Sequence, residues 1–186
     1  MTNKKIQPIT SRGPSAGFTL IELLVVISII GLLTSIMIVS ISAARQKAKN
    51  TKVAADLKQL ATAVTLLQEA TGKWPNGCPP GQASGPEADL DTAQAGVVAR
   101  PIAADQGYGC IWTASEVARW NGPYAKTVGK DPWGFSYRFV PAYCDDQNQS
   151  NPAVISVGIN GVLNTRHPSC PDSNYGLDDI FRRLSN

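Results

Sequence analysis

The chain has 186 residues, enough for one ordinary domain and an appendage but not for two full domains. Hydrophobic residues make up 43% and charged residues 17%, with 17 basic against 14 acidic side chains. The whole positive excess lies in residues 1–17, and from residue 18 onward the charges balance. This composition excludes a disordered chain, a multi-pass membrane protein and a basic nucleic-acid-binding body.

The longest apolar segment covers residues 18–41, in which 17 of 24 residues are hydrophobic. As a helix it would be about 36 Å long, and the hydrocarbon core of a membrane is about 30 Å thick. The segment is too long for the apolar core of a secretory signal, and no A-x-A-type cleavage site follows it. A membrane-spanning signal anchor is the plainest interpretation.

One carboxylate, Glu22, interrupts this apolar run near its start. A lone carboxylate in lipid costs at least about 2.5 kcal/mol, so it requires a partner or a function. One interpretation is that Glu22 reaches the lipid headgroups from the helix end. The other is that it pairs with a positive charge. No basic residue stands four positions away on either side, where Phe18 and Val26 lie, so the natural partner is the amine that a cut before Phe18 would create.

The sequence Gly17-Phe18-Thr19-Leu20-Ile21-Glu22-Leu23 resembles the processing motif of type IV pilins and type II secretion pseudopilins. Residues 1–17 resemble the short basic leader of that family. The resemblance implies that a prepilin peptidase cuts between Gly17 and Phe18 and N-methylates Phe18. Glu22 would then meet the Phe18 amine of a neighbouring subunit, which removes a costly intramembrane charge. Such proteins often carry a proline about where Val39 stands, so we expect a weaker kink here.

Beyond residue 41 a second apolar pattern predicts that the helix continues to about residue 71. The pattern recurs at steps of four and three and comprises Val53, Leu57, Leu60, Val64 and Leu67. Gly72 and Pro75 predict the end of the helix. The stripe is too short for a coiled-coil seam, so we expect it to pack on the protein's own sheet.

The rest of the chain predicts a small head domain. Residues 75–86 hold four prolines and three glycines and indicate a loop, and residues 88–107 show only one weak short helix. Thr113 to Glu116 match a capping box for a short helix that Gly122 could end. Alternating aromatic residues predict a strand over 135–140, and a second strand is predicted over 153–159 before the Asn160-Gly161 turn.

The predicted fold class is α+β and pilin-like, with a long N-terminal helix packed on a small antiparallel sheet. Its predicted parts are a leader (1–17), a transmembrane and assembly half of the helix (18–41), an amphipathic half (42–72) and a globular head (73–186).

Four widely spaced cysteines lie outside the apolar run. No C-x-x-C pair exists, so zinc and thioredoxin-type sites are poorly supported. An even number of such cysteines suits two disulfides in an oxidising compartment, which predicts a head outside the cytoplasm. Three pairings are possible, and we favour the two that join sequence neighbours, Cys78–Cys110 and Cys144–Cys170.

Two segments of the head are similar to the major pseudopilin of type II secretion. They are Gly122-Pro123-Tyr124 with the run from Lys130 to Tyr137, and Ile155 to Gly161 followed by Asp178-Asp179-Ile180. The second segment is similar to a C-terminal loop that binds calcium in that family, which implies Asn160, Asp178 and Asp179 as calcium ligands. Against this, Asn160 replaces the family's aspartate and a disulfide at Cys170 could do the work of calcium. The plainer interpretation is that Asp178 and Asp179 cap a terminal turn.

Enzymatic signatures were not found. His167 is the only histidine, and neither a G-x-S-x-G motif nor a phosphate-binding glycine loop is present. The four tryptophans are expected to form aromatic core rather than a ligand surface. We therefore predict a structural protein that requires no cofactor, with calcium as the one option.

The predicted function is a filament subunit, a pseudopilin of a type II secretion-like system. Its expected partners are copies of itself, related minor pilins, the prepilin peptidase and an inner-membrane assembly platform, and nucleic acid is not among them. The expected location is the bacterial inner membrane, with the head in the periplasm and then in a filament. The alternatives are a type IV pilin of a surface pilus, and a minor pilin at a filament tip that binds a surface or takes up DNA.

Overall fold

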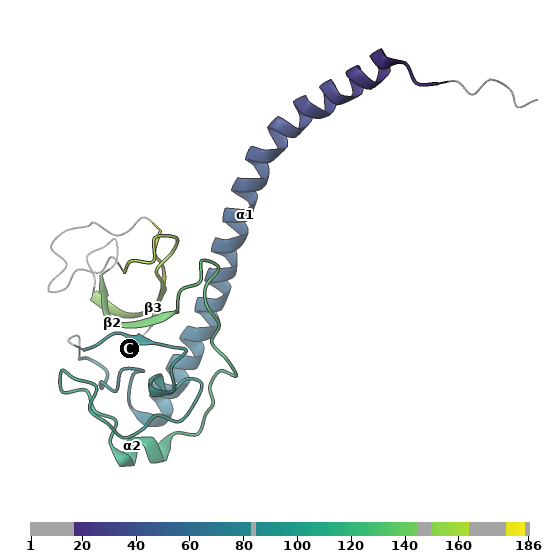
Figure 1. Ribbon diagram of the computed structural model, residues 1–186. Coiled ribbons are helices and arrows are strands. Elements are labelled where there is room, and N and C mark those ends of the chain that lie inside the picture. Colours follow the sequence, from purple (N-terminus) through teal and green to yellow (C-terminus); the bar gives the residue numbers. More distant parts are fainter. Residues whose placement is uncertain (1–16, 83–84, 145–149, 164–177, 185–186) are drawn as a thin grey trace, which may run out of the picture. The chain divides into compact units, whose positions relative to one another are not determined.

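The computed structural model describes residues 17–82, 85–144, 150–163 and 178–184 (Figure 1). The chain divides into two compact units, Met1–Arg45 and Gln46–Asn186. Helix α1 (Leu20–Thr71) contributes to both units, which confirms the long N-terminal helix. It ends where the sequence predicts: Gly72 has a φ of 78°, and its N–H donates to the carbonyl of Gln68 at 2.7 Å. Glycine adopts this left-handed conformation without the strain that a Cβ would cause.

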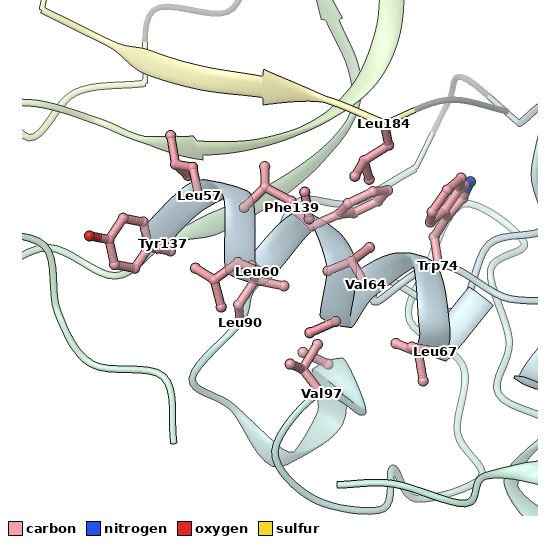
Figure 2. Packing of buried hydrophobic residues seen from close by; sticks show 14 of the residues in the cluster. Leu57, Leu60, Val64, Leu67, Trp74, Leu90, Val97, Tyr137, Phe139 and Leu184 are labelled. Atoms are coloured by element: carbon pink, nitrogen blue, oxygen red, sulfur yellow. The ribbon is translucent and has the colours of Figure 1, made fainter. Parts of the chain in front are cut away.

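The apolar stripe of α1 forms one wall of the core of the second unit (Figure 2). Val53, Val64 and Leu67 are fully buried, and Leu57 and Leu60 are nearly so. Figure 2 labels four of these side chains, from Leu57 to Leu67, among others that come from the sheet and the loops, namely Phe139, Leu184, Leu90 and Val97. Burying each large aliphatic side chain stabilises the fold by about 1.5–3 kcal/mol, so the stripe holds this part of α1 on the sheet, as predicted.

The sheet has four antiparallel strands in the order β1-β2-β3-β4. Its strands are β1 (Ala88–Asp89), β2 (Arg138–Cys144), β3 (Ser150–Ser156) and β4 (Ile180–Arg183). The sequence predicted β2 and β3, which Figure 1 labels, but neither edge strand. Two to four residues are too few for an alternating pattern to show, so β1 and β4 depend on pairing with their neighbours.

The predicted strands begin and end at other residues than expected. Residues 135–137 precede β2 because the backbone of Phe135 is used by a turn, in which its N–H and carbonyl both bond to Asp131. β3 ends at Ser156 rather than at residue 159, because Gly158 takes a φ of 64° and begins the turn that contains Asn160 and Gly161. In both cases a side chain or a glycine turn competes with the ladder for backbone groups.

Helix α2 (Ala114–Arg119) has the predicted capping box: Thr113 accepts from the N–H of Glu116, and Glu116 accepts from the N–H of Thr113. It ends before Gly122, because Trp120 is extended and its indole N–H donates to the carbonyl of Gly96 at 2.7 Å. The weak helical signal before residue 107 corresponds to the single 3-10 turn η1 (Ala93–Ala95).

Candidate functional site

The expected cleavage site lies in the irregular segment directly before α1. Gly17, Phe18 and Thr19 precede the first helical residue, Leu20. Phe18 is 86% exposed, and a Cβ built on Gly17 would meet no atom within 4 Å. Exposed backbone outside regular structure is the kind of segment that proteases cut most readily.

Glu22 has a partner in this structure that the sequence analysis missed. Its Oε2 accepts the backbone N–H of Thr19 at 2.8 Å and the Thr19 hydroxyl at 2.7 Å. In return the N–H of Glu22 donates to the Thr19 hydroxyl at 3.3 Å. This is a capping box at the start of α1, and the Thr-x-x-Glu spacing that signals it is the same as at Thr113. Glu22 therefore helps to begin the helix, whatever else it binds.

The first unit exposes a large apolar surface. The described large hydrophobic side chains of residues 18–41 have exposed fractions from 47% at Val26 to 86% at Phe18. The hydroxyls of Ser28 and Thr34 donate to helix carbonyls four residues earlier, at 2.8 Å and 2.7 Å, so they are compatible with apolar surroundings. An apolar surface of this extent indicates an interaction site or a membrane contact.

Among the residues that the structure describes, no helix is both long and apolar enough to cross a membrane.

A hydrogen bond between two side chains attaches the second half of α1 to the head. Asp56 accepts the hydroxyl of Tyr137 at 2.7 Å and forms an ion pair with Lys52 at 2.5 Å. Burial raises the pKa of Tyr137, and the hydrogen bond to the Asp56 carboxylate raises it further, so the phenol stays protonated and donates. These residues line an open groove of about 380 Å³ between α1 and residues 124–130.

The Asp131-Pro132-Trp133-Gly134 segment folds around a buried carboxylate. Asp131 is 4% exposed, and its Oδ1 accepts the backbone N–H groups of Trp133 at 3.0 Å and Phe135 at 2.9 Å. Its Oδ2 accepts the hydroxyl of Ser156, at the end of β3, at 2.6 Å. Three donors compensate for the loss of water around the charge. The motif therefore fixes the turn to the central strands, while Lys49 lies 5.6 Å above the Trp133 ring.

The residues implied as calcium ligands lie beyond the end of β3. Asn160 donates its backbone N–H and its side-chain N–H to the two oxygens of Asp178, each at 2.8 Å, and its Oδ1 accepts the N–H of Val162 at 2.7 Å. Asp179 directly precedes β4. Within the described residues no group of three or more acidic, histidine or cysteine side chains is placed to hold a metal ion. Asn160 and Asp178, two of the three residues implied as ligands, thus bond to each other in this structure.

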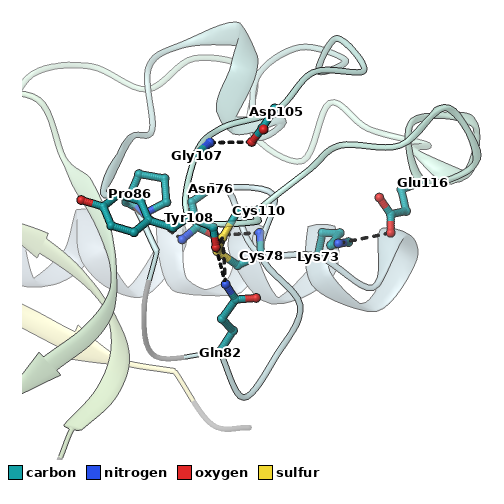
Figure 3. Close-up of a disulfide and its surroundings, with 10 residues drawn as sticks. All are labelled: Lys73, Asn76, Cys78, Gln82, Pro86, Asp105, Gly107, Tyr108, Cys110 and Glu116. Carbon is teal, nitrogen blue, oxygen red and sulfur yellow. Dashed lines mark hydrogen bonds and ion pairs between the residues drawn. A yellow bond between two sulfur atoms is a disulfide. The ribbon is translucent and has the colours of Figure 1, made fainter.

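A disulfide joins Cys78 to Cys110 and so links the loop after α1 to the segment before α2 (Figure 3). This is the favoured pairing for these two cysteines. Buried Asn76 accepts the N–H of Cys78 at 3.1 Å and donates to the carbonyl of Pro86 at 3.0 Å. A Cβ on Gly85 would lie 2.5 Å from the Cys78 sulfur, so only glycine allows the chain to pass this close.

The other predicted site residues divide into two groups. Cys144 belongs to β2, but its expected partner Cys170 and the lone His167 lie outside the described residues. The expected aromatic core is confirmed: Trp74 and Trp112 are buried in it, and Trp120 and Trp133 pack against it.

Comparisons with known proteins give consistent matches along the chain. The prokaryotic N-terminal methylation motif matches residues 12–43, and the model of type II secretion system protein G matches residues 89–169. Type II secretion system core protein G of Aeromonas hydrophila is 27% identical over 81% of this chain and 87% of that protein. Type II secretion system core protein G of Klebsiella pneumoniae is 26% identical over 88% of this chain and 91% of that protein.

One solved structure that is similar to this chain is the major pseudopilin from the type 2 secretion system of enterohaemorrhagic Escherichia coli. The two share 21% sequence identity with a TM-score of 0.44, and the match covers 75% of this chain and 90% of that chain. The methylation motif, the protein G model and the two curated relatives confirm the resemblance of this chain to type IV pilins and type II secretion pseudopilins.

Proposed function

We propose that this protein is a structural subunit of a pilin-like filament, a pseudopilin of a type II secretion-like system, and that its role is not catalytic. The observation that carries the proposal is the combination of two features in one chain. A methylation motif opens an exposed apolar helix, and a head that matches protein G follows it. Together they indicate a membrane-anchored subunit of a periplasmic filament.

Processing by a prepilin peptidase between Gly17 and Phe18 is the first step in this proposal. The cut would leave Phe18 as a methylated N-terminus, three residues before Ile21 and four before Glu22. Both hydrogen bonds from Thr19 end on Oε2 of Glu22. Because a carboxylate has acceptor sites on both oxygens, Oε1 can accept a further donor, and we assign this role to the Phe18 amine of a neighbouring subunit.

Location follows from the same features. We infer that residues 18–41 cross the inner membrane once and that the head lies in the periplasm before assembly. The Cys78–Cys110 disulfide supports this, because disulfides persist in the periplasm and are rare in the cytoplasm. Copies of this chain, related minor pilins and an inner-membrane assembly platform are the proposed partners.

Two substitutions of Glu22 test the pairing and separate it from the capping role. Glu22→Leu removes both the charge and the acceptor for Thr19, whereas Glu22→Gln removes the charge but keeps an oxygen that can cap the helix. Truncating one partner of a buried charge pair costs about 3–5 kcal/mol, and the cost recurs with every subunit added. We therefore expect both variants to be processed at Gly17 and to be missing from sheared filaments.

The outcomes of this experiment distinguish three models. If Glu22→Gln assembles and Glu22→Leu does not, Glu22 acts only as a helix cap. If both variants assemble at wild-type levels, Glu22 merely reaches the headgroups and the pairing is wrong. Immunoblots of membrane and sheared fractions, with the amount of processed subunit as the internal control, measure all three.

A further inference from the structure

The turn that follows β3 is linked to Asp178 by Asn160, whose backbone and side-chain N–H groups donate to the two carboxylate oxygens. We infer that Asn160 holds Asp178 in the role of a bound calcium ion, so that the head folds without calcium. The inference depends on the residues of this chain and not on filament assembly, so its test and that of the proposed function can fail separately.

The hydrogen bonds of Asn160 involve two of the three residues implied as calcium ligands, Asn160 itself and Asp178. Asp178 is the carboxylate of the pair, and each of its oxygens accepts one N–H from Asn160 at 2.8 Å. The amide oxygen of Asn160 is used as well, since it accepts the N–H of Val162 at 2.7 Å. Asn160 therefore donates both N–H groups to Asp178, and its side-chain oxygen accepts a hydrogen bond from a residue of the same turn.

These contacts oppose cation binding on electrostatic grounds. Calcium takes six to eight oxygen ligands, and carboxylates supply most of the charge that holds it. Here each oxygen of Asp178 already accepts one N–H, and the positive ends of these two N–H dipoles oppose a cation that approaches from the same side. Asparagine also brings no negative charge of its own to position 160.

The turn is anchored to the core without an ion. Gly158 has a φ of 64° and lies so close to Asp178 that a Cβ would clash with the Asp178 carbonyl. Its N–H donates to the hydroxyl of Ser156 at 3.3 Å, and that hydroxyl donates in turn to buried Asp131. A continuous set of hydrogen bonds thus connects the Asn160 turn to the Asp131 turn across the end of β3.

Thermal unfolding of the purified full-length mature chain in detergent, followed by tryptophan fluorescence, tests the inference. We expect the wild-type midpoint to agree within about 1 °C in excess EGTA and in millimolar calcium chloride, because a ligand stabilises only a protein that binds it. Isothermal titration with calcium chloride should give no saturable heat.

Two variants of Asn160 provide the matched comparison. Asn160→Ala removes the donor without adding charge and should lower the midpoint by about 3–10 °C in EGTA and in calcium alike. Asn160→Asp should lower it at least as far in EGTA, because two carboxylates then face each other, and calcium should restore part of the loss.

Three results would overturn the inference. The first is a wild-type midpoint that rises by several degrees in calcium, and the second is saturable calcium binding by the wild-type chain. The third is an unchanged midpoint of both Asn160 variants in EGTA, since the amide would then not hold the turn.

Discussion

Asp131 offers the sharpest test of how the head is held together. It is buried, it has three hydrogen-bond donors, and it lies in the motif that joins the turn before β2 to the end of β3. Asp131→Ala leaves the N–H groups of Trp133 and Phe135 and the hydroxyl of Ser156 without an acceptor. Ser156 is fully buried, so water cannot replace the lost partner there.

The expected magnitude follows from these three bonds. A hydrogen bond to a charged group is worth about 1.5–3 kcal/mol, and an unsatisfied buried donor costs about 1–3 kcal/mol. Trp133 is only partly buried and Phe135 is exposed, so their N–H groups regain some hydration after the substitution. We therefore expect Asp131→Ala to lower the free energy of unfolding by about 3–5 kcal/mol, a large share of the 5–15 kcal/mol typical of a domain.

Two further variants calibrate the measurement. Asp131→Asn keeps the shape and the acceptor for the two N–H groups, so it should cost about 1–2 kcal/mol. Asp89→Ala removes an exposed ion pair with Arg138, formed at 3.0 Å, and should cost at most about 1 kcal/mol. Urea unfolding of the purified chain in detergent, monitored by tryptophan fluorescence, gives all three values. A loss below about 1 kcal/mol for Asp131→Ala would refute the reasoning.

Three other predictions concern contacts around the core. Tyr137→Phe removes the hydrogen bond to Asp56 and should lower the free energy of unfolding by about 1–2 kcal/mol in the same urea assay. An unchanged urea midpoint would contradict the attachment of α1 to the head through this bond. Replacing Cys78 and Cys110 together by serine opens a link across 32 residues and should cost about 3–4 kcal/mol in the urea assay, and an unchanged midpoint would contradict this. Burial acts to raise the pKa of Glu116, but its hydrogen bonds with Thr113 and its ion pair with Lys73 lower the pKa overall. The stability that the Glu116 carboxylate contributes is therefore present at neutral pH and is lost as the pH falls through its folded-state pKa. Glu116→Gln should therefore lose less stability on acidification than the wild type, and parallel pH curves of the urea midpoint would contradict this.

The parts of the fold that follow a long periodic pattern were predictable from sequence. The stripe from Val53 to Leu67 is repeated often enough to define both a helix and its buried face, and Gly72 marks where the helix ends. The capping box at Thr113 was predictable because two residue types at a fixed spacing suffice to satisfy the orphan N–H groups.

Features that depend on distant partners were not predictable in this way. The edge strands β1 and β4 carry too few residues for a pattern and exist only through pairing with β2 and β3. The early end of β3 reflects the approach of Gly158 to Asp178, 20 residues away. Only the geometry shows that Asn160 donates to Asp178, since an asparagine side chain can both donate and accept and the sequence does not say which partner it meets.

The N-terminal motif lies between these cases. Its residues identify the cleavage site by resemblance, but the Thr19–Glu22 capping box is a local interaction that the spacing alone could have indicated. A carboxylate in an apolar run predicts a charged partner, whereas here the N–H and the hydroxyl of Thr19 bind it locally.

The most direct test of the central claim is mass spectrometry of this subunit recovered from sheared filaments. The account predicts a chain that begins at Phe18, carries one additional methyl group on its N-terminal amine and contains no residue of 1–17. A filament subunit that begins elsewhere, or an uncut chain found only in the membrane fraction, would contradict the account.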